Sequence, residues 1–250
     1  MTGYSSRGLH GQIVHELGGR ILSGRIRPGT TLDLPTVESE FGISRTVLRE
    51  SLKVLAAKGL VGARQKRGTF VTSPAEWNML DADVLRWRIA AQPTQALLDQ
   101  LGEVRWMVEP ASAALAATRR TDADLTALDA ALAGMDVTSR EVADAVEADV
   151  SFHTALLEAT HNVLIAGLEN VIEQGLRQRD LLVQSSSAAS DSVPTHRAVL
   201  DAVREQDAPA AEQAMRALLE HASIDFERLR HSSSVRRTRT NSASKRRSSR

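Results

Sequence analysis

Residues 44–60, SRTVLRESLKVLAAKGL, constrain the fold of this chain most strongly. Apolar Leu48, Leu52 and Leu55 recur at helical spacing, and another face carries arginine, threonine and lysine, as in an amphipathic helix. A short helical segment precedes it, and Gly42 leaves only a very tight turn between the two. Alone, the basic face is equally consistent with solvated surface. With its neighbours, it predicts the second helix of a helix-turn-helix.

Composition favours a helical protein of two domains. The chain has 250 residues, 42% hydrophobic but only 3% aromatic, so aliphatic side chains must fill its cores and a mainly α fold is expected. There is no cysteine, which leaves histidines and carboxylates as the metal ligands. Because no apolar run reaches membrane-spanning length and no signal-peptide core is visible, we expect a cytoplasmic protein without a membrane partner.

The formal net charge of zero conceals a segregation of charge along the chain. Residues 1–75 carry 11 basic and 5 acidic side chains, residues 76–230 carry 13 and 26, and residues 231–250 carry 7 and none. Because affinity for phosphate depends on local positive charge, the first segment is the expected DNA-binding part. The last segment, rich in serine and arginine, is predicted to be a disordered basic tail.

The residues around the helix-turn-helix complete a small domain. Apolar side chains four apart predict a first helix over residues 9–23. After the basic helix, two short apolar runs flank the polar residues 64–68, which predicts two strands around a basic tip. This order predicts a winged helix-turn-helix domain over residues 8–73, followed by a linker that begins at Ser73.

The motifs PGTTL, FGISRTVLRES, LAAKGLV and RGTFV occur in this order and resemble the DNA-binding domain of GntR-family bacterial transcription regulators. The resemblance implies contacts to double-stranded operator DNA from the start of the basic helix and from the wing tip. The residues so implied are Ser44, Arg45, Thr46, Arg49, Lys66, Arg67 and Gly68. Many members open the preceding helix with Pro-Ser-Glu-Arg, where this chain has DLPT at residues 33–36, so that arginine contact is missing.

Acidic helices are predicted beyond residue 77. Residues 77–87 place two tryptophans, a leucine and a valine at helical spacings, which favours packing anchors over ligand contacts for the two tryptophans. Residues 97–117 alternate apolar spacings of four and three, which predicts a long buried helix with a bend near Pro110. Arg105 lies at the edge of that apolar stripe and needs an anion, which an internal carboxylate and a bound acid could supply equally well.

Several ionisable residues stand where apolar side chains belong. Asp149 and His153 lie one turn apart on the apolar face of one predicted helix, and His196 lies on the apolar face of another. His221 follows an inward-facing leucine and is a further candidate. One buried histidine is usually a satisfied core residue, but this set of oxygen and nitrogen ligands suits a divalent metal ion such as zinc, nickel or manganese.

Residues 77–230 resemble the all-helical, FCD-type ligand-binding domain of the FadR subfamily of these regulators. The matching motifs cover residues 105–117, 149–156 and 196–203. The resemblance implies a metal held by Asp149, His153 and His196, and a small carboxylic acid bound on the metal and by Arg105. The family's third histidine falls here on a leucine, so either His221 substitutes or the metal has three protein ligands.

The segment LDADVLRWR resembles sugar-acid responders of the galactonate or gluconate type. Thr195, directly before His196, has two interpretations: a hydroxyl contact to the effector, or a helix N-cap after Pro194.

These features predict a ligand-responsive regulator, a repressor released from its operator by a small carboxylic acid. One winged domain offers too little contact for tight specific binding, so a homodimer on two half-sites is expected. Two alternatives use parts of the same sequence. Three metal ligands plus a water would suit a metallohydrolase acting on a small acid or lactone, although no HExxH-type pairing supplies a general base, and no enzyme activity is expected. The basic tail would suit a nonspecific architectural DNA-binding protein.

Overall fold

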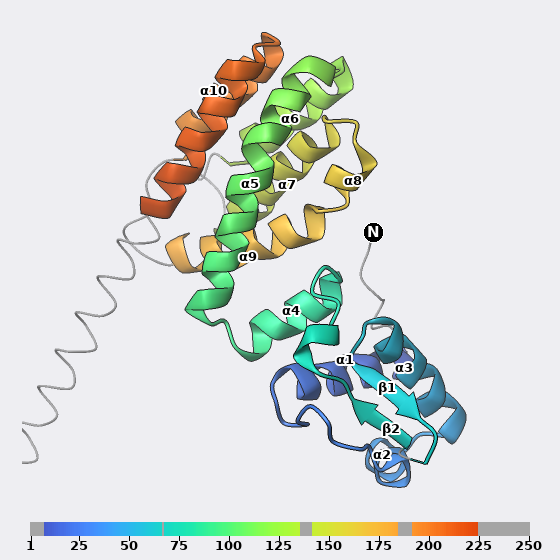
Figure 1. Cartoon of the computed structure of the whole chain (residues 1–250). Helices are drawn as coiled ribbons and strands as arrows, with labels where there is room; N and C mark the ends of the chain where they lie inside the picture. Colours follow the sequence, from blue (N-terminus) through green and yellow to red (C-terminus); the bar gives the residue numbers. More distant parts are fainter. Residues whose placement is uncertain (1–7, 67, 136–141, 185–191, 225–250) are drawn as a thin grey trace, which may run out of the picture. The chain divides into compact units, whose positions relative to one another are not determined.

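The computed structural model describes residues 8–66, 68–135, 142–184 and 192–224. Two compact units, residues 1–97 and 98–250, divide the chain. Both are mainly helical, and within the described ranges the only sheet is a two-stranded wing in the first unit, which confirms the predicted fold class (Figure 1). Arg67 and the predicted basic tail over 231–250 lie outside the described residues.

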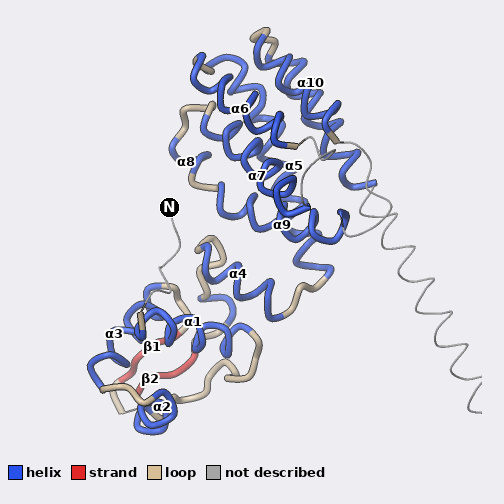
Figure 2. The backbone as a smooth tube through the Cα atoms, turned by 180° about the vertical axis from the view of Figure 1, so that it is seen from behind, coloured by secondary structure: helices blue, strands red, loops and turns tan. Residues whose placement is uncertain are grey.

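The first unit contains a winged helix-turn-helix. Its elements are α1 (Leu9–Leu22), α2 (Leu34–Phe41), α3 (Arg45–Ala57), β1 (Val61–Arg64), β2 (Gly68–Val71), a 3-10 turn (Pro74–Glu76) and α4 (Ala82–Ala91). The two strands are antiparallel, with Val61 opposite Val71 and Arg64 opposite Gly68 (Figure 2). The wing therefore follows α3 directly, as predicted from the sequence.

Local backbone chemistry fixes the turn between α2 and α3. Gly42 ends α2 with φ 60° and ψ 39°, a left-handed conformation that glycine adopts without strain. Ser44 then caps α3, because its side chain accepts a hydrogen bond from the Val47 amide at 3.4 Å. Apolar side chains of α3, among them Leu48 and Leu55, are buried against α1, so the opposite face of α3 stays exposed.

Helix α4 belongs to the first unit and packs against α1. Trp87 is only 4% exposed, lies in the same apolar core as α1 and α3, and donates a hydrogen bond from Nε1 to His15 Nδ1 at 2.8 Å. Helical spacing within residues 77–87 indicated an apolar face but did not identify the helices against which that face packs. The division between the two units follows residue 97 and therefore lies later in the chain than the linker expected at Ser73. Leu80, which the helical spacing placed on the same face as the tryptophans, is 64% exposed because α4 begins only after it.

The second unit is a bundle of helices around α7. Its elements are α5 (Gln95–Arg119), α6 (Asp122–Gly134), α7 (Val142–Glu158), α8 (Val163–Ala166), α9 (Glu169–Gln184), α10 (Val193–Arg204) and a further helix over residues 208–224. α7 packs against α6, α8 and α9, and α10 packs against α6. Phe152 and Leu156 of α7 are buried in one core with alanines of α5 and apolar residues of α10. Residues on the inward face of α7 are thus shielded from water.

The buried face of α5 differs from the predicted stripe. Leu101, Arg105 and Glu109 are buried, whereas Val108 is only half-buried and Ala111 is exposed. Because Arg105 and Glu109 neutralise each other, as described below, they can be buried beside the predicted apolar stripe. Among the described residues, none of the helices combines the length and the apolar character required to cross a membrane.

Candidate functional site

Three ionisable side chains that the sequence singled out meet inside the second unit. Asp149 and His153 come from successive turns of α7, and His196 comes from the first turn and a half of α10. Asp149 is 3% exposed, His153 0% and His196 1%. One potential ligand atom from each of the three lies within 4.8 Å of the others. The structure therefore brings together the three residues that the sequence assigned to a metal.

The orientation of both imidazole rings suits metal binding. His196 Nδ1 lies 2.8 Å from the Ser192 carbonyl oxygen, and His153 Nδ1 lies 2.7 Å from Glu109 Oε2. For His196, this contact directs the Nδ1 proton toward the carbonyl oxygen and leaves Nε2 with a lone pair. For His153, the close approach of Glu109 lacks hydrogen-bond geometry, but Arg105 Nη2 lies 3.3 Å from Nε2 and can only donate, so Nε2 carries the lone pair there as well. His196 Nε2 lies 3.1 Å from Asp149 Oδ1, and His153 Nε2 lies 4.0 Å from Asp149 Oδ2.

These donors fit a divalent cation. Burial lowers the pKa of His153 even though Glu109 opposes the shift, so the imidazole is neutral at physiological pH, as a ligand must be. His196 Nε2 has no hydrogen-bond partner of good geometry in spite of its burial. Two imidazole nitrogens and one carboxylate suit zinc, nickel or manganese, and these three ligands do not by themselves distinguish among the metals.

Glu109 joins this cluster, although sequence reasoning missed it. Arg105 donates from Nε to Glu109 Oε1 at 2.5 Å and from Nη2 to Oε2 at 3.3 Å. Burial is the largest single influence and opposes ionisation of Glu109, but Arg105 and His153 together outweigh it and lower the pKa of Glu109 to about 2. The internal carboxylate expected as one of two possible partners of Arg105 is therefore present. Its position one helical turn after Arg105 was the available sequence signal.

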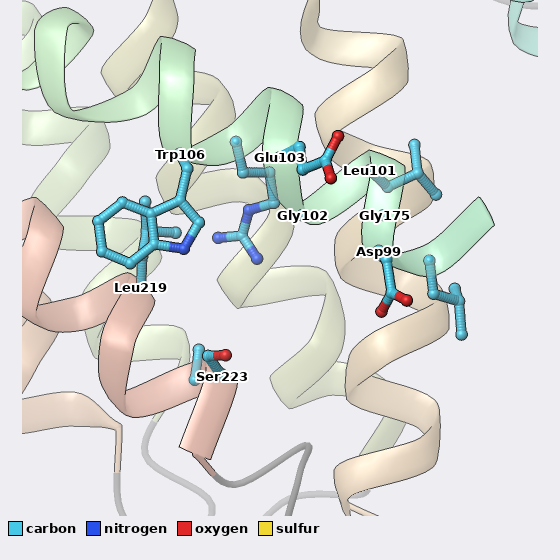
Figure 3. A pocket seen from close by; sticks show the side chains of 11 residues that line it. Asp99, Leu101, Gly102, Glu103, Trp106, Gly175, Leu219 and Ser223 are labelled. Carbon is cyan, nitrogen blue, oxygen red and sulfur yellow. The ribbon is translucent and has the colours of Figure 1, made fainter. Parts of the chain in front are cut away.

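A cavity of about 270 Å³ lies beside Arg105, between α5, α9 and the helix over residues 208–224. Figure 3 shows Asp99, Glu103, Trp106 and Ser223 around it, so its walls offer an aromatic face, two carboxylates and a hydroxyl. Its volume is near the lower end of small-molecule sites, which span roughly 300–1,000 Å³. The cavity can accommodate a small polar molecule with Arg105 as its buried cation.

The two remaining candidates, His221 for the metal and Thr195 for the effector, lie outside both the three-residue cluster and the lining of the cavity. The metal-ligand cluster found among the described residues does not include His221, which is partly buried on the helix over residues 208–224. Thr195 is a residue of the first turn of α10, whose N-cap is Ser192, and its hydroxyl donates to the Ser192 carbonyl at 2.8 Å. The N-cap interpretation of Thr195 was therefore wrong, and the cavity beside Arg105 is lined by other residues.

The residues expected to touch DNA lie on exposed parts of the first unit. Arg45, Thr46 and Arg49 are exposed on the first two turns of α3, directly after the capping Ser44. At the wing tip, Lys66 has φ 69° and Gly68 has φ 77°, and both are exposed. These residues form two separate basic features of one winged domain, the start of α3 and the tip of the wing.

Comparison with known proteins identifies both regions. Residues 9–71 match the bacterial regulatory proteins of the gntR family, and residues 100–221 match the FCD domain. The chain belongs to the GntR family of regulators, in the FadR subfamily with an FCD domain. It is therefore a DNA-binding transcription regulator rather than an enzyme, and the metallohydrolase alternative is set aside.

Curated relatives match about four fifths of the chain. The galactonate operon transcriptional repressor of Escherichia coli (strain K12) is 36% identical over 208 residues, covering 81% of this chain and 90% of that protein. The regulator LutR of Bacillus subtilis (strain 168) is 31% identical over 213 residues, covering 80% and 92%. The structure of Lar, which controls the Listeria monocytogenes agr system, matches with a TM-score of 0.62 over 89% of this chain and 98% of that one. At 20% identity, this last match shows the fold alone.

Proposed function

We propose that this regulator is a repressor that leaves its operator when a small hydroxylated carboxylic acid binds beside a divalent metal in the FCD domain. The observation that carries the proposal is the position of Arg105, which lines the cavity and also lies 3.3 Å from His153 at the metal cluster. One side chain thus connects a space for a ligand with a set of metal ligands.

The metal-binding part of the proposal assigns three protein ligands. Asp149, His153 and His196 are buried and close together, and each histidine has its Nδ1 beside an oxygen acceptor. A divalent metal held there would keep coordination positions open for the carboxylate and an adjacent hydroxyl of an acid. His221 lies outside the cluster and is assigned no role as a ligand.

The cavity and the relatives support the proposed class of acid. Arg105 offers a guanidinium, which pairs with carboxylates, and Asp99, Glu103 and Ser223 can accept or donate hydrogen bonds to hydroxyl groups. One relative is named for the galactonate operon and another is the Uxu operon transcriptional regulator of Escherichia coli (strain K12), 29% identical over 202 residues. A sugar acid of the galactonate or gluconate type fits these features best, and Thr195 is not assigned to its binding.

The DNA-binding part assigns the operator contacts to the start of α3 and to the wing tip. The exposed residues are Ser44, Arg45, Thr46, Arg49, Lys66 and Gly68, with Arg67 beside them in sequence. Arginine pairs bidentately with guanine, and each such pair discriminates among bases by about 1–3 kcal/mol. In a homodimer, two winged domains would contact two half-sites, and acid binding would favour an arrangement of the dimer that no longer fits both.

A thermal-shift screen followed by a gel shift tests the proposal. Protein stripped with a chelator is reloaded with Zn²⁺, Ni²⁺ or Mn²⁺ and melted with galactonate, gluconate or lactate. Binding at 100 times Kd stabilises the folded state by about 2.7 kcal/mol. Metal alone should therefore raise the melting temperature, and the acid should raise it further only when metal is present. The same acid should release a DNA fragment selected in vitro for binding. Stabilisation by the acid without any metal would contradict the proposed site.

A further inference from the structure

Glu109 is the common partner of the acid-binding and the metal-binding groups. It is 1% exposed and lies between Arg105, which donates to it from two nitrogens, and His153, whose Nδ1 is 2.7 Å away. Neither the metal cluster nor the lining of the cavity includes Glu109 itself. A carboxylate in this place therefore acts on both sites through other side chains.

Two different partners could use the lone pair of His153 Nε2, namely Arg105 and a metal ion. Arg105 Nη2 lies 3.3 Å from His153 Nε2. A guanidinium nitrogen can only donate, so this contact requires the lone pair of Nε2, in agreement with a protonated Nδ1 beside Glu109. A metal ligated by His153 would need the same lone pair. The contact between Arg105 and His153 and the ligation of a metal by His153 are therefore mutually exclusive.

Electrostatic repulsion also opposes the presence of a metal ion while Arg105 contacts His153. Arg105 is permanently cationic, and a divalent cation at Asp149, His153 and His196 would be a like charge close by in a poorly solvated interior. Glu109 neutralises Arg105, and it can keep this guanidinium in place after the contact with His153 is lost. Because Arg105 also lines the cavity, an Nη2 donor that no longer serves His153 remains next to the space for a ligand.

We propose that Glu109 is a positioning residue that couples the two sites. When His153 Nε2 ligates a metal, the contact between His153 and Arg105 is lost while Glu109 holds the guanidinium in place. The released Nη2 donor of Arg105 then binds the carboxylate of an acid in the cavity. This inference rests on the proposed function. It adds that metal loading prepares Arg105 for the acid, and that Arg105 weakens metal binding when no acid is present.

The test measures metal affinity without any acid, by competition with a chromogenic chelator at pH 8, where few imidazoles are protonated. Changes in groups that orient metal ligands shift metal affinity by about 10–100-fold. Glu109→Gln should weaken metal binding within that range, and Glu109→Asp should restore part of it. Arg105→Met, which removes the competing donor and the like charge, should bind metal about tenfold more tightly than the unmodified protein. Arg216→Met, which removes an arginine 51% exposed on another helix, should change nothing.

A double variant guards against misfolding. Arg105→Met alone leaves Glu109 buried and unpaired, whereas Arg105→Met with Glu109→Gln leaves no unpaired charge. The double variant should bind metal at least tenfold more tightly than Glu109→Gln alone. Wild-type affinity in Arg105→Met, or no gain in the double variant, would overturn the coupling while leaving the proposed function intact. If the unmodified protein binds no metal at all, the proposed function fails first.

Discussion

The ammonium group of Lys58 lies 2.8 Å from each carboxylate oxygen of Asp81. Lys58 is the C-cap residue of α3, and Asp81 is the N-cap residue of α4. Lys58 also lies 2.9 Å from Asp83, which is buried in the second position of α4. Burial alone would lower the pKa of Lys58, but these two carboxylates raise it, so the lysine stays charged. The C-terminal end of α3, the helix that carries the proposed DNA contacts, is thus linked to α4 by an ionic contact.

Removing Asp81 should destabilise the first unit. Asp81→Ala deletes one partner of Lys58 and the cap whose side chain accepts from the amides of Asp83 and Val84. We expect the free energy of unfolding in urea to fall by about 1–2 kcal/mol, the range for loss of an N-cap. Glu50→Ala breaks an exposed ion pair with Lys53 on α3 and should cost well under 1 kcal/mol. Equal losses in both variants would contradict a special role for the link.

Two adjacent glycines of α1 should respond in opposite directions to alanine. A Cβ at Gly18 would lie 2.3 Å from the Trp87 ring, whereas a Cβ at Gly19 would meet nothing within 4 Å. Gly18→Ala should lower the free energy of unfolding by about 1–3 kcal/mol through overpacking. Gly19→Ala should raise it by about 0.5–1 kcal/mol, because alanine favours a helix interior. Urea unfolding followed by tryptophan fluorescence distinguishes the signs, and stabilisation by Gly18→Ala would argue against the packing of α4 on α1.

Metal-dependent stabilisation should require the buried histidines. His153→Ala and His196→Ala should abolish the rise in melting temperature that metal produces, and Asp149→Ala should do the same. His161→Ala is the matched control, because His161 is about half exposed and pairs with Asp124 instead. It should keep the full metal response. An undiminished response in Asp149→Ala or His153→Ala would refute the assigned ligand set.

DNA retention should depend on the start of α3. Arg45→Ala and Arg49→Ala should abolish retention of a selected operator fragment in a gel shift while metal and acid still stabilise the protein. Each variant that loses a phosphate contact should also reduce the slope of log affinity against log salt by about 1. Lys53→Ala lies on the same helix but is paired with Glu50, so it should bind DNA nearly as well as the unmodified protein. Normal retention by both arginine variants would contradict the interface.

Local patterns in the sequence were sufficient to predict the winged domain and the cluster of Asp149, His153 and His196. The turn at Gly42 depends on a residue that tolerates a left-handed conformation, and the cap at Ser44 depends on its own hydroxyl. His153 and His196 were recognisable because they interrupt apolar helical faces, and helices that bury those faces must also bury the histidines. Such features need only neighbours within one or two helical turns.

Features that depend on which helices pack together could not be predicted from the sequence. An acidic residue four positions after Arg105 is equally consistent with a surface ion pair, so Glu109 revealed its role only in the folded bundle. Trp87 was recognised as an anchor, but its partners His15 and Gly18 lie about seventy residues earlier. His221 has nearly the right place in the sequence, yet the helix that carries it does not bring it into the cluster.

The chain has three tryptophans, and their positions give the second unit an optical reporter of its own. Trp77 and Trp87 pack on the core of the first unit, whereas Trp106 is 39% exposed and lines the cavity beside Arg105. An indole at that wall would change its emission when a solute displaces water from the cavity. Titrations of acid and metal can therefore be followed by intrinsic fluorescence, without a label, and Trp106→Phe identifies the part of the signal that comes from the cavity.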